Sequence, residues 1–146
     1  MPIRLEEYDS CPFCRYVARE TECAFVVENE LAAAFVNKTQ YEHGGMLVIP
    51  RQHRETILDI EEAEIASVHR LAKQLARAAV SSLGAVAVNV FQNNGIKSGQ
   101  HVPHYHVHVI PRYEASDPNR IFGQQGFPIT PMAEQLAVAA TIRAAL

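Results

Sequence analysis

Three histidines alternate with other residues in the run HYHVHVI at positions 104–110. Successive side chains of a strand point to opposite faces, so an extended backbone places His104, His106 and His108 on one face and the intervening Tyr and Val side chains on the other. An imidazole has an unperturbed pKa of about 6.5, so near neutrality it serves as a nucleophile, an acid or a metal ligand. This alternation predicts a chemical site on the face of the three histidines, which we call the triad.

Three interpretations of the triad are open at this point: a His-rich surface strand, a catalytic metal held by all three histidines, or nucleophilic catalysis on phosphate. The preceding segment, 93–100, contains Gly95 and Gly99, which allow backbone N–H groups to turn toward an anion, and Gln100 could donate to a phosphate oxygen. No Asp or Glu lies between Gly84 and Arg112 to complete a catalytic metal site. The combination favours phosphate chemistry.

Cys11 and Cys14 form a Cys-x-x-Cys pair, and the chain has three cysteines in all. An odd count argues against a disulfide framework, and in a reducing compartment such a pair is more often metal-binding or redox-active. A redox pair is expected at a helix start after a strand, and nothing before Cys11 has a strand pattern. Structural zinc requires four N or S ligands, and His53 and His104 are plausible as the two that complete the set. The alternative is a cysteine pair that binds no metal. Cys23 is expected to be a small buried residue.

Hydrophobic patterning and turn residues predict an α+β domain with a mainly antiparallel sheet of about five strands. A long helix is expected to follow an N-cap at Asp59, with Glu62 three residues later, and to stop at Gly84. A second helix is expected from Pro131, at an N1 position, to the C-terminus. The expected strands cover residues 24–28, 31–36, 46–49, 86–92 and 104–110.

Composition narrows the class of protein. The chain has 146 residues, a length that suits one domain (1–146) with a real core. The formal net charge of −3 provides no bulk attraction for nucleic acid. No apolar run approaches the roughly 18 residues of a membrane span, and the N-terminal residues lack a hydrophobic signal core. We therefore expect a cytoplasmic protein with no nucleic-acid or membrane partner.

The motifs together resemble the histidine triad (HIT) superfamily, whose signature is His-x-His-x-His followed by two apolar residues. The resemblance covers roughly residues 11–112, with a C-terminal loop and helix at 113–146. It rests most specifically on 99–112 and is supported by Asn93 with Gly95, by the LVIP run at 47–50 with His53, and by the strand at 31–37.

The resemblance implies a homodimeric hydrolase or nucleotidyl transferase that cleaves at the α-phosphate of a purine nucleotide, such as an AMP-containing phosphoramidate or dinucleoside polyphosphate. His106 is then the nucleophile and forms a covalent nucleotidyl-histidine intermediate, while the carbonyl of His104 fixes its tautomer. His108 and Gln100 hold phosphate oxygens and the leaving group. Asn37 would bind the ribose. The implied nucleotide-binding set is Asn37, Asn93, Gly99, Gln100, His101, His106 and His108.

Zinc-bearing branches of the superfamily use a Cys₂His₂ set, which here implies structural zinc at Cys11, Cys14, His53 and His104.

One position departs from the family pattern. Gly45 stands where the family usually has a histidine near the α-phosphate, and His43 cannot be assumed to replace it. His101, which follows Gln100, is the candidate for a compensating donor. The departure motivates a second hypothesis, a non-catalytic nucleotide sensor. The segment 113–131, with glycines and glutamines at 123–126, is expected to be a mobile loop that could reach over a site.

Overall fold

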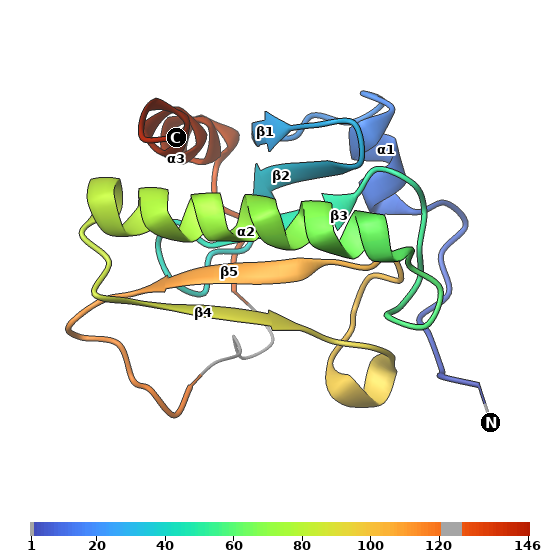
Figure 1. The fold of residues 1–146 in the computed structure, drawn as a ribbon. Coiled ribbons are helices and arrows are strands. Elements are labelled where there is room, and N and C mark those ends of the chain that lie inside the picture. The colour runs from blue at the N-terminus through green and yellow to red at the C-terminus, as the bar shows by residue number, and fades with distance from the viewer. Residues whose placement is uncertain (1, 121–126) are drawn as a thin grey trace.

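A five-stranded antiparallel sheet forms the centre of the computed structural model, which describes residues 2–120 and 127–146 (Figure 1). The strands are β1 (Phe25–Glu28), β2 (Ala32–Val36), β3 (Met46–Pro50), β4 (Ala87–Gln92) and β5 (Val107–Arg112), in the spatial order β1-β2-β3-β5-β4. The helices are α1 (Pro12–Val17), α2 (Glu62–Leu83) and α3 (Met132–Ala144), with a 3₁₀ turn η1 (Ile96–Ser98). The expected α+β class and the mainly antiparallel sheet are confirmed.

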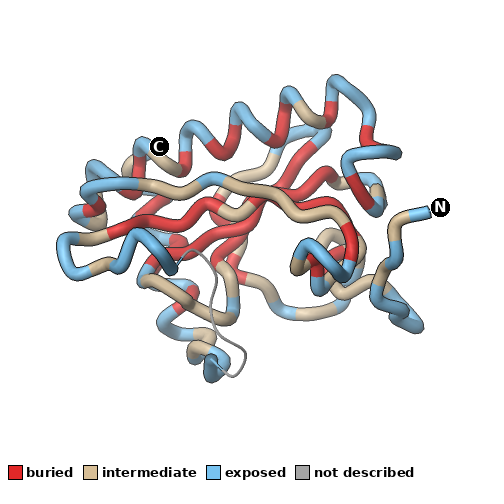
Figure 2. Tube along the Cα trace, turned by 90° about the horizontal axis from the view of Figure 1, so that it is seen from below, coloured by how far each residue is buried: buried red, intermediate tan, exposed pale blue. Residues whose placement is uncertain are grey.

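The two faces of the sheet carry different cores. α2 and α3 pack on one face, where the main apolar cluster contains Tyr105, Val107 and Val109. On the other face, Phe13 of α1 packs with Phe35 in a smaller cluster. Figure 2 shows the central strands as buried between these layers. The predicted alternation of the triad segment is therefore correct, since its apolar residues face α2.

The strand that carries the triad is shorter than predicted. β5 begins at Val107 rather than at His104, and it pairs with β3 and β4 from that residue onward. Before it, the backbone makes other bonds: the N–H of Tyr105 donates to the carbonyl of Arg54, and the carbonyl of His104 accepts from the ring of His106. His104 and His106 thus precede the sheet ladder while keeping the alternation of an extended chain.

Two helix starts differ from the sequence prediction. Asp59 is not the N-cap of α2, because its carboxylate accepts from the N–H groups of Glu55 and Thr56 in the preceding turn. The N-cap is Glu61, whose N–H donates to the carboxylate of Glu64 at 2.9 Å. α3 begins at Met132 with Pro131 as its N-cap, one residue later than expected.

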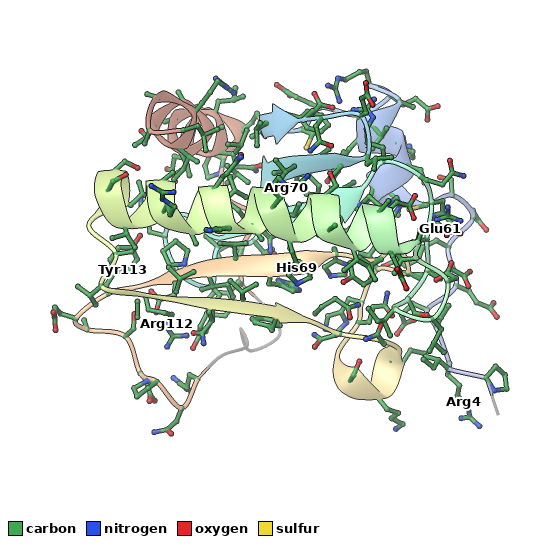
Figure 3. The ribbon with its side chains drawn as sticks, viewed as in Figure 1. Arg4, Glu61, His69, Arg70, Arg112 and Tyr113 are labelled. Carbon is green, nitrogen blue, oxygen red and sulfur yellow. The ribbon has the colours of Figure 1, made fainter. Side chains whose placement is uncertain are left out.

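Several described residues of the segment 113–131 contact the loop between β2 and β3 or the end of β5. The guanidinium of Arg112 donates to the carbonyls of Asp117 and Arg120, and the hydroxyl of Tyr113 donates to the carbonyl of His43 at 2.7 Å. Figure 3 places Arg112 and Tyr113 near the end of β5, from which this segment departs. The glycines and glutamines at 123–126, where a mobile loop was expected, lie outside the described residues.

Within residues 2–120 and 127–146, no helix combines the length and the apolar character that a membrane crossing requires.

Candidate active site and metal centre

A cavity of about 540 Å³ opens on the sheet face that carries the triad. His106 and His108 line it, and their ring centroids lie 4.9 Å apart. Aromatic side chains provide much of the remaining wall, namely Tyr8, Phe13, Tyr16, Phe35, Tyr41, Phe91 and Phe127. A cavity of this size and apolar character fits a small organic ligand, and the two imidazoles give it a reactive wall.

The tautomer of His106 follows from one hydrogen bond. Its Nδ1 lies 2.8 Å from the backbone carbonyl oxygen of His104, and both groups are buried. A carbonyl can only accept, so Nδ1 carries the proton and Nε2 keeps an unshared electron pair. This is the arrangement that the family resemblance implied for a histidine nucleophile.

Burial keeps the triad neutral. Loss of water lowers the pKa of His106 below its usual value, although its hydrogen bond to His104 acts in the opposite direction. Burial and then the neighbouring His106 lower the pKa of His108 to about 3. Both imidazoles are therefore uncharged at neutral pH. His106 is available as a nucleophile without prior deprotonation, and His108 can offer one N–H to an oxygen.

Gln100 is not placed as the resemblance implied. Its side chain is buried, and its Oε1 accepts from the N–H of Gly95 at 2.6 Å. Its Nε2 donates to the carbonyls of Glu55 and Val102 at 2.7 and 3.2 Å. Because these bonds use both polar ends, the side chain stabilises the loop instead of facing a phosphate, and it does not belong to the described cavity wall.

Of the other residues expected to contact the nucleotide, besides the two triad histidines, three line the cavity and Asn93 does not. Asn37, Gly99 and His101 line the cavity. The Oδ1 of Asn37 accepts from the N–H and hydroxyl of Thr39, both at 3.2 Å, so its amide N–H₂ is the group it can offer to a ligand. Asn93 lies behind the described wall, with its Nδ2 3.5 Å from the carbonyl oxygen of Gly99.

Gly45 forms part of the cavity wall, whereas His43 is exposed and is not among the described lining residues. A Cβ atom added at Gly45 would meet the carbonyl oxygen of Glu42 at 3.5 Å and the Nε2 of Gln40 at 3.8 Å, which are ordinary contacts. The absence of a histidine at this position is therefore not forced by the backbone. His43 does not replace the missing imidazole.

Cys11, Cys14, His53 and His104 meet next to His106, and we call this group the metal corner. Their ligand atoms lie within 4.8 Å of one another. Sγ of Cys14 is 3.3 Å from Nδ1 of His53, and Nδ1 of His104 is 3.4 Å from Sγ of Cys11 and 3.5 Å from Sγ of Cys14. Tetrahedral zinc bonds to S and N imply S···N separations of about 3.5 Å, so this donor set fits zinc.

Without a bound cation, the Cys14 thiol and the His104 imidazole of the metal corner are both uncharged at neutral pH. Burial and the adjacent Cys11 raise the pKa of Cys14 to about 12, so its thiolate requires a nearby positive charge. Burial lowers the pKa of His104 to about 4, which leaves the imidazole neutral. Its Nε2 donates to the carbonyl of Pro50 at 2.8 Å, and this bond leaves Nδ1 unprotonated for a metal.

This geometry argues against a metal chelated by the whole triad. His104 uses Nδ1 in the metal corner and Nε2 on Pro50, so no ring nitrogen remains to share a metal with His106 and His108. Among the residues that the structure describes, the metal corner is the only arrangement of three or more such ligands.

Several cavity residues have no counterpart in the sequence prediction. Phe13, Tyr16 and Phe35 were not identified as site residues, although Phe13 lies inside the Cys-x-x-Cys motif and Phe35 lies two residues before Asn37. Cys23, expected to be a small buried residue, is half-buried and lines the cavity, and burial raises the pKa of its thiol to about 12. Aromatic residues near a predicted ligand are the available signal, but only the fold shows which of them face the cavity.

Comparison with known proteins agrees with the family resemblance that the histidine motif and the fold suggest. The model of the HIT domain family matches residues 18–115. The protein named hit of Bacillus subtilis is 35% identical over 109 residues, covering 75% of each chain. An adenosine 5′-monophosphoramidase of Schizosaccharomyces pombe is 32% identical over 126 residues, covering 84% of this chain and 88% of that one.

Solved structures show the same fold. A HIT-like protein from Bartonella henselae superposes with a TM-score of 0.84 at 28% identity, covering 97% of this chain and 100% of the other. A zinc-bound histidine triad protein from Mycobacterium smegmatis gives a TM-score of 0.79 at 27% identity, covering 93% and 92%.

The fold and the site define a protein of the histidine triad class. The chain belongs to the HIT domain family.

Proposed function

We propose that this protein hydrolyses or transfers the nucleotidyl group of an AMP-containing purine nucleotide, by attack of His106 on the α-phosphorus. The observation that carries the proposal is the 2.8 Å hydrogen bond from Nδ1 of His106 to the carbonyl of His104, because it directs the unshared pair to Nε2. The similarity to an adenosine 5′-monophosphoramidase supports a phosphoramidate substrate.

The proposed reaction has two steps. Nε2 of His106 forms a bond to phosphorus while the bond from phosphorus to the leaving amine or phosphate breaks, and the leaving group takes a proton from solvent at the cavity mouth. Nδ1 keeps its proton, and the His104 carbonyl stabilises the positive charge that develops on the ring. Water then forms a bond to phosphorus and gives up one proton to solvent as the N–P bond breaks, which releases AMP and restores the neutral imidazole.

The remaining residues bind and orient the nucleotide in this proposal. His108 donates an N–H to a phosphate oxygen, and His101 supplies a further donor at the exposed side. Asn37 binds the ribose hydroxyls, and the backbone at Gly99 approaches the phosphate. Gln100 and Asn93 act indirectly, by holding the loop that presents Gly99 and His101.

We also propose that zinc occupies the metal corner. Zinc would hold Cys11, Cys14, His53 and His104 together and supply folding free energy, and no step of the proposed reaction passes through it. The zinc-bound relative from Mycobacterium smegmatis supports this assignment.

The test of the function is His106→Ala. We expect it to lower turnover of adenosine 5′-phosphoramidate by at least about 10³-fold while AMP still binds within a few-fold of the parent affinity. Calorimetry would measure the binding and liquid chromatography the released AMP. Turnover by the Ala variant at the parent rate would end the proposal.

The second candidate function is a nucleotide sensor without catalysis. Its specific support is Gly45, which stands where the family usually has a histidine. A protein of that kind would bind AMP and leave the phosphoramidate intact over hours. Measurable turnover by the parent that His106→Ala abolishes would exclude it.

We further propose that the protein is a homodimer, as the family resemblance implies. Among the strands that the structure describes, β4 lies at one edge of the sheet, and its residue Val90 is exposed. The outer edge of β4 could therefore pair with the same strand of a second copy. Sedimentation equilibrium would test this proposal, and a monomer at micromolar concentration would contradict it.

A further inference from the structure

Phe13 touches the nucleophile of the proposed reaction. Its ring is perpendicular to that of His106, at an interplanar angle of 90° and a centroid distance of 5.3 Å. Both side chains are buried, with exposed fractions of 7% and 5%. Edge-to-face packing of this kind restricts the rotation of both rings. His106 is thus confined on one side by an aromatic ring and tied at Nδ1 by the His104 carbonyl.

The position of Phe13 depends on the two cysteines that flank it. Cys11 is the N-cap of α1, and its Sγ accepts from the N–H of Cys14 at 3.4 Å. α1 spans only six residues, a length at which a helix is marginal without tertiary support. Ligation of both cysteines with His53 and His104 would fasten α1 to the rest of the fold, and Phe13 is the buried residue that this short helix inserts against the sheet.

A second path joins the same two regions. His104 belongs to the metal corner through Nδ1, while its carbonyl accepts the hydrogen bond that fixes the tautomer of His106. The ring of Phe13 also packs against the ring of His104, at 6.0 Å between centroids. The side chains of Phe13, His104 and His106 therefore pack against one another. A displacement of α1 would change the position of the His106 ring through its contacts with Phe13 and with His104.

We propose that Phe13 is a positioning residue that holds the His106 ring with Nδ1 toward the His104 carbonyl, and that the metal corner acts as the anchor of the helix that carries it. The proposal deepens the proposed function, on which it rests for the role of His106 as nucleophile. It assigns the metal corner an effect on the site beyond folding, although the metal takes no part in the reaction.

The experiment reads the His106 tautomer directly, on the zinc-loaded full-length chain without substrate. Side-chain ¹⁵N spectra of histidine-labelled protein would be assigned by the signal lost in His106→Asn. We expect one tautomer with protonated Nδ1 in the parent and in Phe13→Tyr, which keeps an aromatic ring. In Phe13→Leu we expect a mixture of tautomers or an exchange-broadened signal, with zinc still bound.

Phe25→Leu is the matched control. Phe25 packs on Phe35 in the same apolar cluster, with centroids 6.2 Å apart, but is not among the described residues of the cavity wall. It should lose stability without changing the His106 signal. If Phe13→Leu does not fold, Phe13→Met replaces it, since methionine fills the volume without a ring. In turnover, Phe13→Leu should lower kcat about three- to tenfold.

Removal of zinc from the parent tests the second half of the proposal. We expect the zinc-free, folded parent to show the same loss of a single His106 tautomer as Phe13→Leu. A single protonated-Nδ1 tautomer in folded Phe13→Leu would overturn the positioning role, and the same result in the zinc-free parent would overturn the anchoring role. The spectra require no turnover, so they test the positioning and anchoring roles separately from the proposed function. The proposed function is tested by the turnover of His106→Ala.

Discussion

The metal corner and the cavity meet between His104 and His106, yet they are assembled in different ways. The imidazoles at positions 106 and 108 come from a single short segment, and local alternation is enough to bring them together. The metal corner joins Cys11 to His104, which are 93 residues apart, and it also needs His53 from the segment after β3. The difference shows that local backbone geometry positions the reactive groups, whereas the whole fold is needed to position their support.

The largest effect should come from breaking the metal corner. Cys11→Ser removes one of two thiolates, so we expect bound zinc to fall well below one per chain and the free energy of unfolding to drop by several kcal/mol. Elemental analysis and denaturant unfolding would measure both. Cys23→Ser is the control, because Cys23 is outside the metal corner, and it should keep its zinc. Full zinc content in Cys11→Ser would disprove the assignment.

A smaller effect is expected at Gln100, which the sequence places in the cavity and the structure places behind it. Gln100→Ala leaves the N–H of Gly95 and the carbonyl of Glu55 without their partner, at a cost of about 1–3 kcal/mol in unfolding free energy. AMP affinity should change only a few-fold. An unchanged stability together with a more than tenfold loss of AMP affinity would return Gln100 to the phosphate site.

His108 should make stability depend on pH. Its pKa is about 3 in the folded chain and about 6.5 when unfolded, so between these values only the unfolded state binds the proton. The stabilisation is complete above about pH 6.5 and is lost as pH falls toward 3, by on the order of 1 kcal/mol per pH unit. The stability difference between parent and His108→Asn should follow this slope in urea unfolding at pH 7, 6 and 5. Parallel pH profiles would refute the burial argument.

The smallest effect on stability is expected at Gly45. Gly45→His should change the unfolding free energy by less than about 1 kcal/mol, since the added Cβ meets only ordinary contacts. It should raise phosphoramidate turnover by adding a donor to the cavity wall. A large loss of stability would show that the position requires glycine, and unchanged turnover would show that the missing histidine has no catalytic consequence.

Much of this architecture could be predicted from the sequence. Period-two and helical patterning predicted the antiparallel sheet and the long helix, and the alternation of residues 104–109 correctly separated the triad from the residues that face α2. The grouping of the four metal ligands was implied by the family resemblance, and the structure brings them together. Asp59 is not a helix cap because its carboxylate accepts from the N–H groups of Glu55 and Thr56 in the preceding turn. Pro131 has an extended backbone and is the N-cap of α3 instead of its first helical residue.

The sequence could not reveal how polar side chains are used. The amide of Gln100 is able to donate to a phosphate oxygen. In the fold, however, its oxygen accepts from the backbone N–H of Gly95 and its nitrogen donates to the backbone carbonyl of Glu55. The contact of Phe13 with His106 likewise depends on how α1 docks on the sheet. Such features follow from tertiary packing, which residue spacing alone does not encode.

The most direct test of the central claim is to trap the covalent intermediate. The parent would be mixed with a stoichiometric amount of labelled adenosine 5′-phosphoramidate, quenched in base within milliseconds, and digested for mass spectrometry. We predict an acid-labile AMP adduct on the peptide that contains His106, formed and lost at rates that account for turnover, and no adduct in His106→Ala. Turnover without any adduct on His106 at any time point would contradict the account.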